Sequence, residues 1–282
     1  MRPSSFQILP PVIKNILIIN VLFLFADFVL EKSFGIKIGD VFGLHFFFSP
    51  KFRIYQIITY LFIHADFFHL LSNMFSLWMF GAVLENYWGP KRFLTFYFVT
   101  GIGAAITHYA VYFYQVYPLI HDVNYLMANA DTLNSRDLVE LFRSGHLMIT
   151  PELKEDFNGF FSQFQSLEQQ GQHHQMASLI TDFFSHYKEE VYNLPVVVGA
   201  SGAIFGLLLA FGMLFPNTLI YIYFAIPIKA KYFVLFYGLV ELGSGVWNNP
   251  GDNVAHFAHL GGMLFGFFLI KAWNKTNRQN FY

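Results

Sequence analysis

The chain has 282 residues, of which 55% are hydrophobic and 12% charged, and its mean hydropathy is +0.43. Soluble proteins carry about a quarter charged residues, so the composition excludes an ordinary soluble enzyme and predicts a polytopic membrane protein. The net charge of −1 gives no reason to expect nucleic acid, and the absence of cysteine excludes disulfides, thiol catalysis and thiolate metal sites.

Six apolar stretches of helical length are predicted to cross the membrane. They cover residues 13–30, 67–87, 92–115, 199–215, 230–247 and 255–271. The first follows Arg2 and Lys14 as the apolar region of a signal peptide would, but no small-residue cleavage site comes after it. We interpret it as a retained anchor. The sequence therefore predicts an all-α membrane protein, a bundle of six transmembrane helices in a single domain, 1–282.

Two connections between these stretches are also apolar. Residues 41–50 form an aromatic run that is too short to span, so the first loop, 31–66, is expected to lie in the membrane interface. Residues 219–228 could extend the fifth span or form a loop that dips into the membrane. The loop is favoured because Pro227 and two lysines interrupt the run.

Residues 118–194 differ in kind from the rest of the chain. They contain eleven of the 18 acidic residues and five of the 11 histidines, but only four of the 17 basic residues. Apolar residues recur every three to four positions, as from Phe157 to Leu167, which predicts amphipathic helices in a water-exposed insertion between the third and fourth spans. His173, His174 and His186 could bind a metal, but scattered histidines in a solvated segment are usually ordinary polar residues.

Basic residues predict the orientation. Nine of the 17 fall on one side if the six spans alternate, and the positive-inside rule makes that side cytoplasmic, with both termini. We therefore expect a multi-pass protein of a cell membrane such as the bacterial inner membrane, with the insertion on the outer side. The nine are Arg2, Lys14, Lys91, Arg92, Lys229, Lys231, Lys271, Lys275 and Arg278.

Ser201 stands near the start of the fourth span, flanked by Gly199 and Gly202. A serine in an apolar helix more often packs or bonds to a backbone carbonyl than reacts. The glycines favour a reactive serine, because they permit close backbone approach and expose the hydroxyl and nearby amides at a helix N-terminus, where negative charge is stabilised. Ser201 is therefore the candidate nucleophile.

The sixth span begins with a histidine and a stripe of small residues. His259, Gly262 and Gly266 share one helix face, while Gly202 and Gly206 give the fourth span a small surface of its own. Such surfaces let two helices pack unusually close. We expect this packing to bring His259 within hydrogen-bond distance of the serine.

His259 is the candidate base. It could instead only bond a neighbouring helix, and His256 competes for the role but lies nearer water and outside the glycine register. Asp252 is in a loop and Asp66 precedes the second span, so no aspartate occupies a triad position. We predict a Ser201–His259 dyad, with orientation supplied by packing rather than by a carboxylate.

His69 and Asn73 lie four residues apart in the second span and so point along one helix face. Acyl transfer creates an oxyanion that needs hydrogen-bond donors, which these side chains and the Ser201 amide could supply. The alternative is that the pair holds helices together. Glu85 and Glu241 lie in apolar stretches and are interpreted as structural hydrogen-bond partners rather than a third catalytic member.

These motifs, His69 with Asn73, Gly199 to Gly202 and Ala258 to Gly266, occur in this order on the second, fourth and sixth spans and together resemble the rhomboid family of intramembrane serine proteases. The resemblance implies a six-helix fold around a water-accessible cavity, a membrane-embedded first loop and a mobile fifth helix with a cap loop near 244–254 as the gate. For the site it implies that Ser201 is the nucleophile and that His259 is the base and then the acid. It implies that His69, Asn73 and the Ser201 amide stabilise the oxyanion in a hole shaped by Gly199. Glu85 would be a structural glutamate.

The chain departs from the family pattern in two places. Tyr55-Gln56 stands where many members carry Trp-Arg in the first loop, and the insertion between spans three and four is usually short. The implied reaction is hydrolysis of a peptide bond in or beside a transmembrane segment, without a cofactor, on membrane-protein substrates within the lipid bilayer. The alternatives are a catalytically inactive rhomboid-like protein that binds membrane clients, and a transporter or channel that relays protons through histidines.

Overall fold

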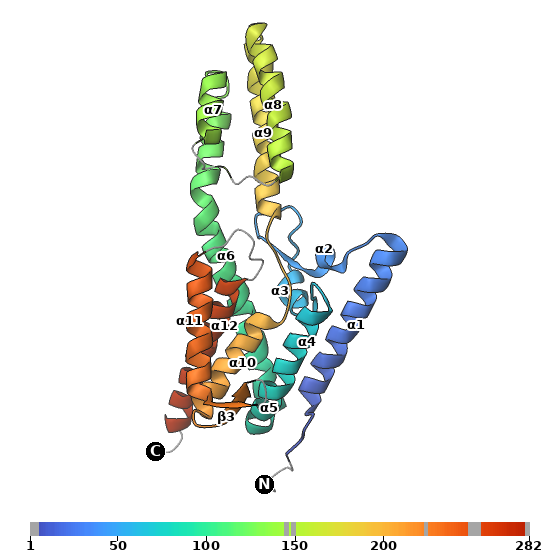
Figure 1. Ribbon diagram of the computed structural model, residues 1–282, viewed down its shortest axis with the longest axis vertical. Helices are drawn as coiled ribbons and strands as arrows, with labels where there is room; N and C mark the ends of the chain where they lie inside the picture. Colours follow the sequence, from blue (N-terminus) through green and yellow to red (C-terminus); the bar gives the residue numbers. More distant parts are fainter. Residues whose placement is uncertain (1–5, 144–146, 148–150, 223–224, 248–254, 280–282) are drawn as a thin grey trace. The chain divides into compact units, whose positions relative to one another are not determined.

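The computed structural model describes residues 6–143, 147, 151–222, 225–247 and 255–279. Helices account for most of them (Figure 1). The chain divides into two compact units: unit 1 comprises 1–45, 53–110 and 196–282, and unit 2 comprises 46–52 and 111–195.

Unit 1 contains the helices that correspond to the predicted spans, joined by short elements. The helices are α1 (Pro11–Phe34), α4 (Phe67–Ser76), the π-helical turn η2 (Leu77–Gly81), α5 (Ala82–Trp88), the first part of α6 (Pro90–Ala128), α10 (Ser201–Leu214), α11 (Ala230–Trp247) and α12 (His256–Gln279). The short elements are α2 (Ile38–Phe42), β1 (Leu44–His45), α3 (Gln56–Thr59), η1 (Tyr60–Phe62), β2 (Val196–Val197), β3 (Leu219–Ile222) and β4 (Ile226–Lys229).

The helices leave a large apolar surface uncovered by protein. Among the described residues, three segments are long and apolar enough to cross a membrane: Pro11–Phe34, Phe67–Trp88 and Pro90–Ala128. In α1 the buried residues are Ile13, Ile16 and Asn20, while most of its other apolar side chains are exposed. Apolar surface of this extent is costly in water and requires lipid. The chain is a multi-pass membrane protein.

The first loop is held by hydrogen bonds from the side chains of Tyr55 and Gln56. Gln56 is buried, accepts hydrogen bonds from the backbone N–H groups of His45 and Arg53, and donates to the carbonyl of Val41. Tyr55 donates its hydroxyl to the same carbonyl. Tyr55-Gln56, where the sequence departs from the family pattern, therefore anchors this loop through backbone contacts.

The segment before α10 is tied to the first loop. β1 pairs with β2 in antiparallel fashion, Leu44 opposite Val197. Two residues further, the Gly199 N–H donates to the carbonyl of Tyr60, whose hydroxyl donates to the carbonyl of Gly101 in α6. These bonds fix the chain on its approach to Ser201.

Two local features left open or bounded by the sequence are defined by the structure. Residues 219–222 (β3) and 226–229 (β4) pair as antiparallel strands, with Ile220 opposite Ile228, so the alternative that this stretch extends the fifth helix is wrong. Pro227 lies in β4, where its fixed φ suits an extended strand better than a helix interior. In addition, α6 continues beyond residue 118, the predicted start of the insertion, and runs through Pro118 to Ala128. The Tyr114 carbonyl that loses its partner belongs to an exposed residue, which lowers the cost of the proline.

Unit 2 is a small helical assembly with an aromatic core. It contains the end of α6 and three further helices, α7 (Ser135–Arg143), α8 (Pro151–Gln169) and α9 (His173–Asn193). The periodic apolar side chains of α8 and α9 meet, and the rings of Phe160 and Phe183 stack at 4.2 Å. The Tyr112 hydroxyl donates to the Val191 carbonyl. Within 118–194, where the sequence predicts amphipathic helices, the described residues are largely helical.

Candidate active site

Ser201 and His259 come together at the first turns of α10 and α12. The distance between Ser201 Oγ and His259 Nε2 is 2.8 Å. His259 is buried, and its ring stacks on that of Phe205, one turn after Ser201, at 4.1 Å and 10°. The hydroxyl of the partly buried Ser201 and the buried imidazole thus form a hydrogen-bonded pair.

Glycines allow this approach of α10 and α12. A Cβ added to Gly262 would lie 1.8 Å from the carbonyl oxygen of Gly202, and one added to Gly266 would lie 3.4 Å from that of Gly206. On its other side, Gly202 packs against Ala104 of α6, where an added Cβ would be 2.4 Å from the alanine methyl. The helices are in backbone contact at Gly202 and Gly262, which leaves no room for a side chain at either position, whereas at Gly266 an added Cβ would be in ordinary contact with the Gly206 carbonyl.

The second helix presents two polar side chains to the same region. A Cβ on Gly199 would lie 2.8 Å from Nε2 of His69 and 3.6 Å from Nδ2 of Asn73, so both groups border the backbone just before Ser201. Gly199 has φ +107°, a conformation that only glycine adopts without strain. His69, Asn73 and Gly199 are therefore neighbours of one another.

The hydrogen bonds of His69 and Asn73 leave donors available at this position. Asp66 caps α4 by accepting the His69 N–H, and His69 Nδ1 accepts weakly, at 3.4 Å, from the N–H of Ala65. An accepting Nδ1 puts the ring proton on Nε2, the nitrogen next to Gly199. The Nδ2 of Asn73 is buried and has no hydrogen-bond partner among the described residues.

A carboxylate lies on the far side of His259. Glu241 of α11 is buried, and its Oε2 lies 2.9 Å from His259 Nδ1 and 2.6 Å from His256 Nδ1. The expectation that packing alone orients His259 is wrong, because a carboxylate bonds its second nitrogen. His256 does not take the place of His259 beside the serine, since it is His259 whose Nε2 bonds Ser201.

Glu85 has a structural position. It is buried in α5, and its two carboxylate oxygens accept hydrogen bonds of 2.9 Å from the backbone N–H groups of Val12 and Ile13 at the start of α1. A carboxylate at a helix N-terminus satisfies unpaired amides and favours the helix dipole. Glu85 therefore joins α5 to the start of α1.

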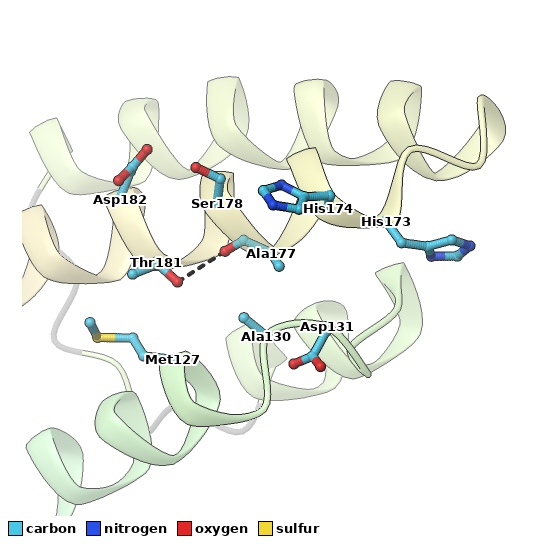
Figure 2. Close-up of a pocket in the computed structure, with 9 residues that line it drawn as sticks. All are labelled: Met127, Ala130, Asp131, His173, His174, Ala177, Ser178, Thr181 and Asp182. Carbon is cyan, nitrogen blue, oxygen red and sulfur yellow. Dashed lines mark hydrogen bonds between the residues drawn. The ribbon is translucent and has the colours of Figure 1, made fainter.

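The described histidines of unit 2 do not form a group of three possible metal ligands. A cavity of about 480 Å³ is lined by residues from the end of α6 and from α9, including Asp131, His173, His174 and Asp182. Figure 2 shows His173 at one end and Asp182 at the other. Among the residues that the structure describes, only Glu241, His256 and His259 bring three possible metal ligands together. A metal site built on His173 and His174 finds no support in this geometry.

Sequence reasoning left two contacts of the site unassigned. Phe205 follows Ser201 by four residues, so a helix places both on one face, and this spacing could have identified it. For Glu241, the signal was a carboxyl group in an apolar helix, which is costly unless it has a partner. The predicted cap loop near 244–254, with Asp252, falls largely outside the described residues.

Comparisons with known proteins agree with these motifs. The family model of the Rhomboid domain matches residues 51–119 and 173–274, which include both helices of the Ser201–His259 pair and leave most of the acidic segment between the two matched stretches. Rhomboid protein 1, mitochondrial, of Saccharomyces cerevisiae is 31% identical over 115 residues, 36% of this chain and 32% of that protein. Rhomboid-like protein 11, chloroplastic, of Arabidopsis thaliana is 39% identical over 57 residues, 20% of each chain. The chain thus aligns with a third or less of the length of these relatives. The domain model matches more than half of the residues of this chain, and the chain therefore belongs to the rhomboid family.

Proposed function

We propose that this chain is an intramembrane serine endopeptidase that hydrolyses peptide bonds in or next to transmembrane segments of membrane proteins. The observation that carries the proposal is the 2.8 Å contact between Ser201 Oγ and His259 Nε2 at the first turns of two packed helices. A hydroxyl bonded to a neutral imidazole is the arrangement that general-base activation requires. Membership of the rhomboid family supports the same chemistry.

In the proposed reaction, His259 takes the proton of Ser201 as the oxygen attacks the scissile carbonyl. His69, Asn73 and the Ser201 amide stabilise the oxyanion, and Gly199 keeps the space beside them open. His259 then gives its proton to the leaving amine. In the second half, His259 takes a proton from water as the water attacks the acyl-enzyme carbonyl, and it returns that proton to Ser201 Oγ as the carboxyl product leaves. The neighbouring donors on His69 and Asn73 support this assignment.

The topology that goes with this proposal has six transmembrane helices in one domain, both termini in the cytoplasm and the acidic segment 118–194 as an insertion outside. Basic residues on one side of the spans support it, as does the gap in the domain match between 119 and 173. A cell membrane such as the bacterial inner membrane is the proposed location. Reporter fusions after residues 89 and 134 test the two sides.

Cleavage of a reconstituted substrate tests the activity. Purified protein in liposomes is mixed with a single-span test protein that carries small residues at the outer end of its helix. We expect one cleavage product, lost in Ser201→Ala and in His259→Ala and retained in Ser162→Ala, a control at a surface serine of α8. His256→Ala is expected to retain much of the activity.

The inactive, client-binding alternative makes the opposite prediction. It requires that the wild-type protein binds the test substrate without cleaving it and that Ser201→Ala changes neither result. A fluorophosphonate probe adds a readout that is independent of the substrate, since only an activated serine reacts with it. Absence of both cleavage and labelling in folded wild-type protein would refute the proposed function.

A further inference from the structure

Glu241 is a buried carboxyl group in a largely apolar helix, and the dyad chemistry described above does not use it. Such a group is costly in a membrane protein unless it is bonded, and its partners therefore indicate its purpose. One partner is His259, whose two ring nitrogens bond in opposite directions, Nδ1 to Glu241 Oε2 at 2.9 Å and Nε2 to Ser201 Oγ at 2.8 Å. Carboxylate, imidazole and hydroxyl form one continuous hydrogen-bonded series.

This hydrogen-bonded series decides which ring nitrogen of His259 carries the proton. An ionised carboxylate only accepts hydrogen bonds, so a bond to Nδ1 requires the proton on Nδ1. Nε2 then has a free lone pair for the serine proton. The opposite tautomer would place a proton between Nε2 and Ser201 and leave the imidazole unable to act as base.

We propose that Glu241 is a positioning residue for His259, which makes the site a serine–histidine–glutamate triad rather than a dyad; the inference rests on the proposed function. Glu241 holds the productive tautomer before the reaction. After His259 accepts the serine proton, the carboxylate faces the imidazolium and stabilises its charge. Glu241 itself neither gains nor loses a proton in the cycle.

His256 supports the same carboxylate. Its Nδ1 lies 2.6 Å from Glu241 Oε2, and its ring stands at 89° to that of His259, with 6.4 Å between the centroids. One carboxylate oxygen has two lone pairs and can accept from both rings. His256 thereby fixes the oxygen that orients His259, which gives it a role one step further from the serine.

A metal ion between the same three side chains is the competing explanation. Tetrahedral zinc with bonds of about 2.0–2.2 Å keeps its ligand atoms about 3.3–3.6 Å apart. The nitrogen–oxygen separations of 2.6 and 2.9 Å are shorter and match hydrogen bonds. A shared proton therefore fits the geometry better than an ion does.

Kinetics of three Glu241 variants test the inference. Glu241→Gln removes the charge and permits the wrong tautomer, so we expect kcat to fall by about 10²-fold to 10⁴-fold with little change in KM. Glu241→Asp keeps the charge at a greater distance and should recover part of the loss, while Glu241→Leu should not. Labelling of Ser201 by the fluorophosphonate probe should slow in the same order.

Glu85→Gln is the matched control, because it neutralises a second buried glutamate that bonds only backbone at the start of α1. We expect it to lower the Tm in detergent while the kcat of the folded protein is kept. Addition of EDTA should leave wild-type kcat unchanged. A loss with EDTA that zinc restores would replace the inference by the metal explanation.

A direct measurement covers the case in which Glu241 variants fail to fold. In wild-type protein labelled with ¹⁵N-histidine, the His259 signal, assigned by its loss in His259→Ala, should show a protonated Nδ1. An unprotonated Nδ1 overturns the inference, as does Glu241→Gln that cleaves within threefold of wild type. If wild-type protein cleaves no better than Ser201→Ala, the proposed function itself fails. If wild type and Glu241→Gln both cleave while Ser201→Ala and His259→Ala do not, the dyad stands and the triad falls.

Discussion

Replacing Gly262 by alanine should force α10 and α12 apart. The added Cβ would lie 1.8 Å from the Gly202 carbonyl oxygen, whereas ordinary van der Waals contact begins at 3.4 Å. Relief by rigid separation requires a movement of about 1.6 Å, since backbone on both sides leaves no flexible side chain to rotate. Ser201 Oγ and His259 Nε2, 2.8 Å apart in the structure, would then exceed hydrogen-bond distance.

The expected cost follows from this displacement. A misplacement of about 1 Å in a catalytic pair can reduce the rate about 10²-fold, which corresponds to about 2.7 kcal/mol of activation free energy. Overpacking also destabilises the fold, typically by about 1–3 kcal/mol. Gly262→Ala should therefore lower both kcat/KM and Tm.

Initial rates in liposomes and thermal unfolding in detergent measure the two effects. Gly243→Ala is the matched control, because Gly243 is a helical glycine of α11 at which an added Cβ meets nothing within 4 Å. It should keep wild-type activity and Tm. Wild-type activity within threefold and an unchanged Tm in Gly262→Ala would refute the argument that the two helix backbones are in contact here.

Two further predictions concern the second helix and the segment before it. Asn73→Ala should reduce kcat about 10²-fold to 10³-fold with little effect on KM, because it removes a proposed oxyanion donor; an equal rise in KM would indicate a binding role. Burial, together with the neighbouring charge of His69, lowers the pKa of His64 from 6.5 to about 3. Below pH 6.5 the His64 imidazole is therefore protonated in the unfolded chain but not in the folded protein. The free energy of unfolding should fall as the pH drops below 6.5, by about 2 kcal/mol at pH 5. The Tm difference between pH 7.5 and pH 5 should shrink in His64→Leu; an unchanged difference contradicts this cause.

The helices of the bundle follow from local sequence because their signal is local. A run of about 20 apolar residues can satisfy its backbone in lipid only as a helix, so α1 and α6 are evident without knowledge of the fold. The glycine stripe of Gly262 and Gly266 is equally readable, since its period is that of the helix itself. The end of α6 could not be predicted from the sequence, because a proline normally ends a helix. Here Pro118 is tolerated inside α6 because the carbonyl that loses its hydrogen bond belongs to the exposed Tyr114.

The sequence by itself singled out the candidate side chains of the proposed site: Ser201 between glycines, His259 in a small-residue register, and His69 with Asn73 on one helix face. It did not determine what lies behind His259. A glutamate in an apolar stretch has the same appearance in sequence whether its helix turns it toward lipid, a backbone amide or an imidazole. Glu85 and Glu241 are alike in this respect, yet one bonds the start of α1 and the other bonds His259. The rotation of a helix and the neighbours of its side chains are set by packing between segments far apart in the chain, and that packing places Glu241 beside His259.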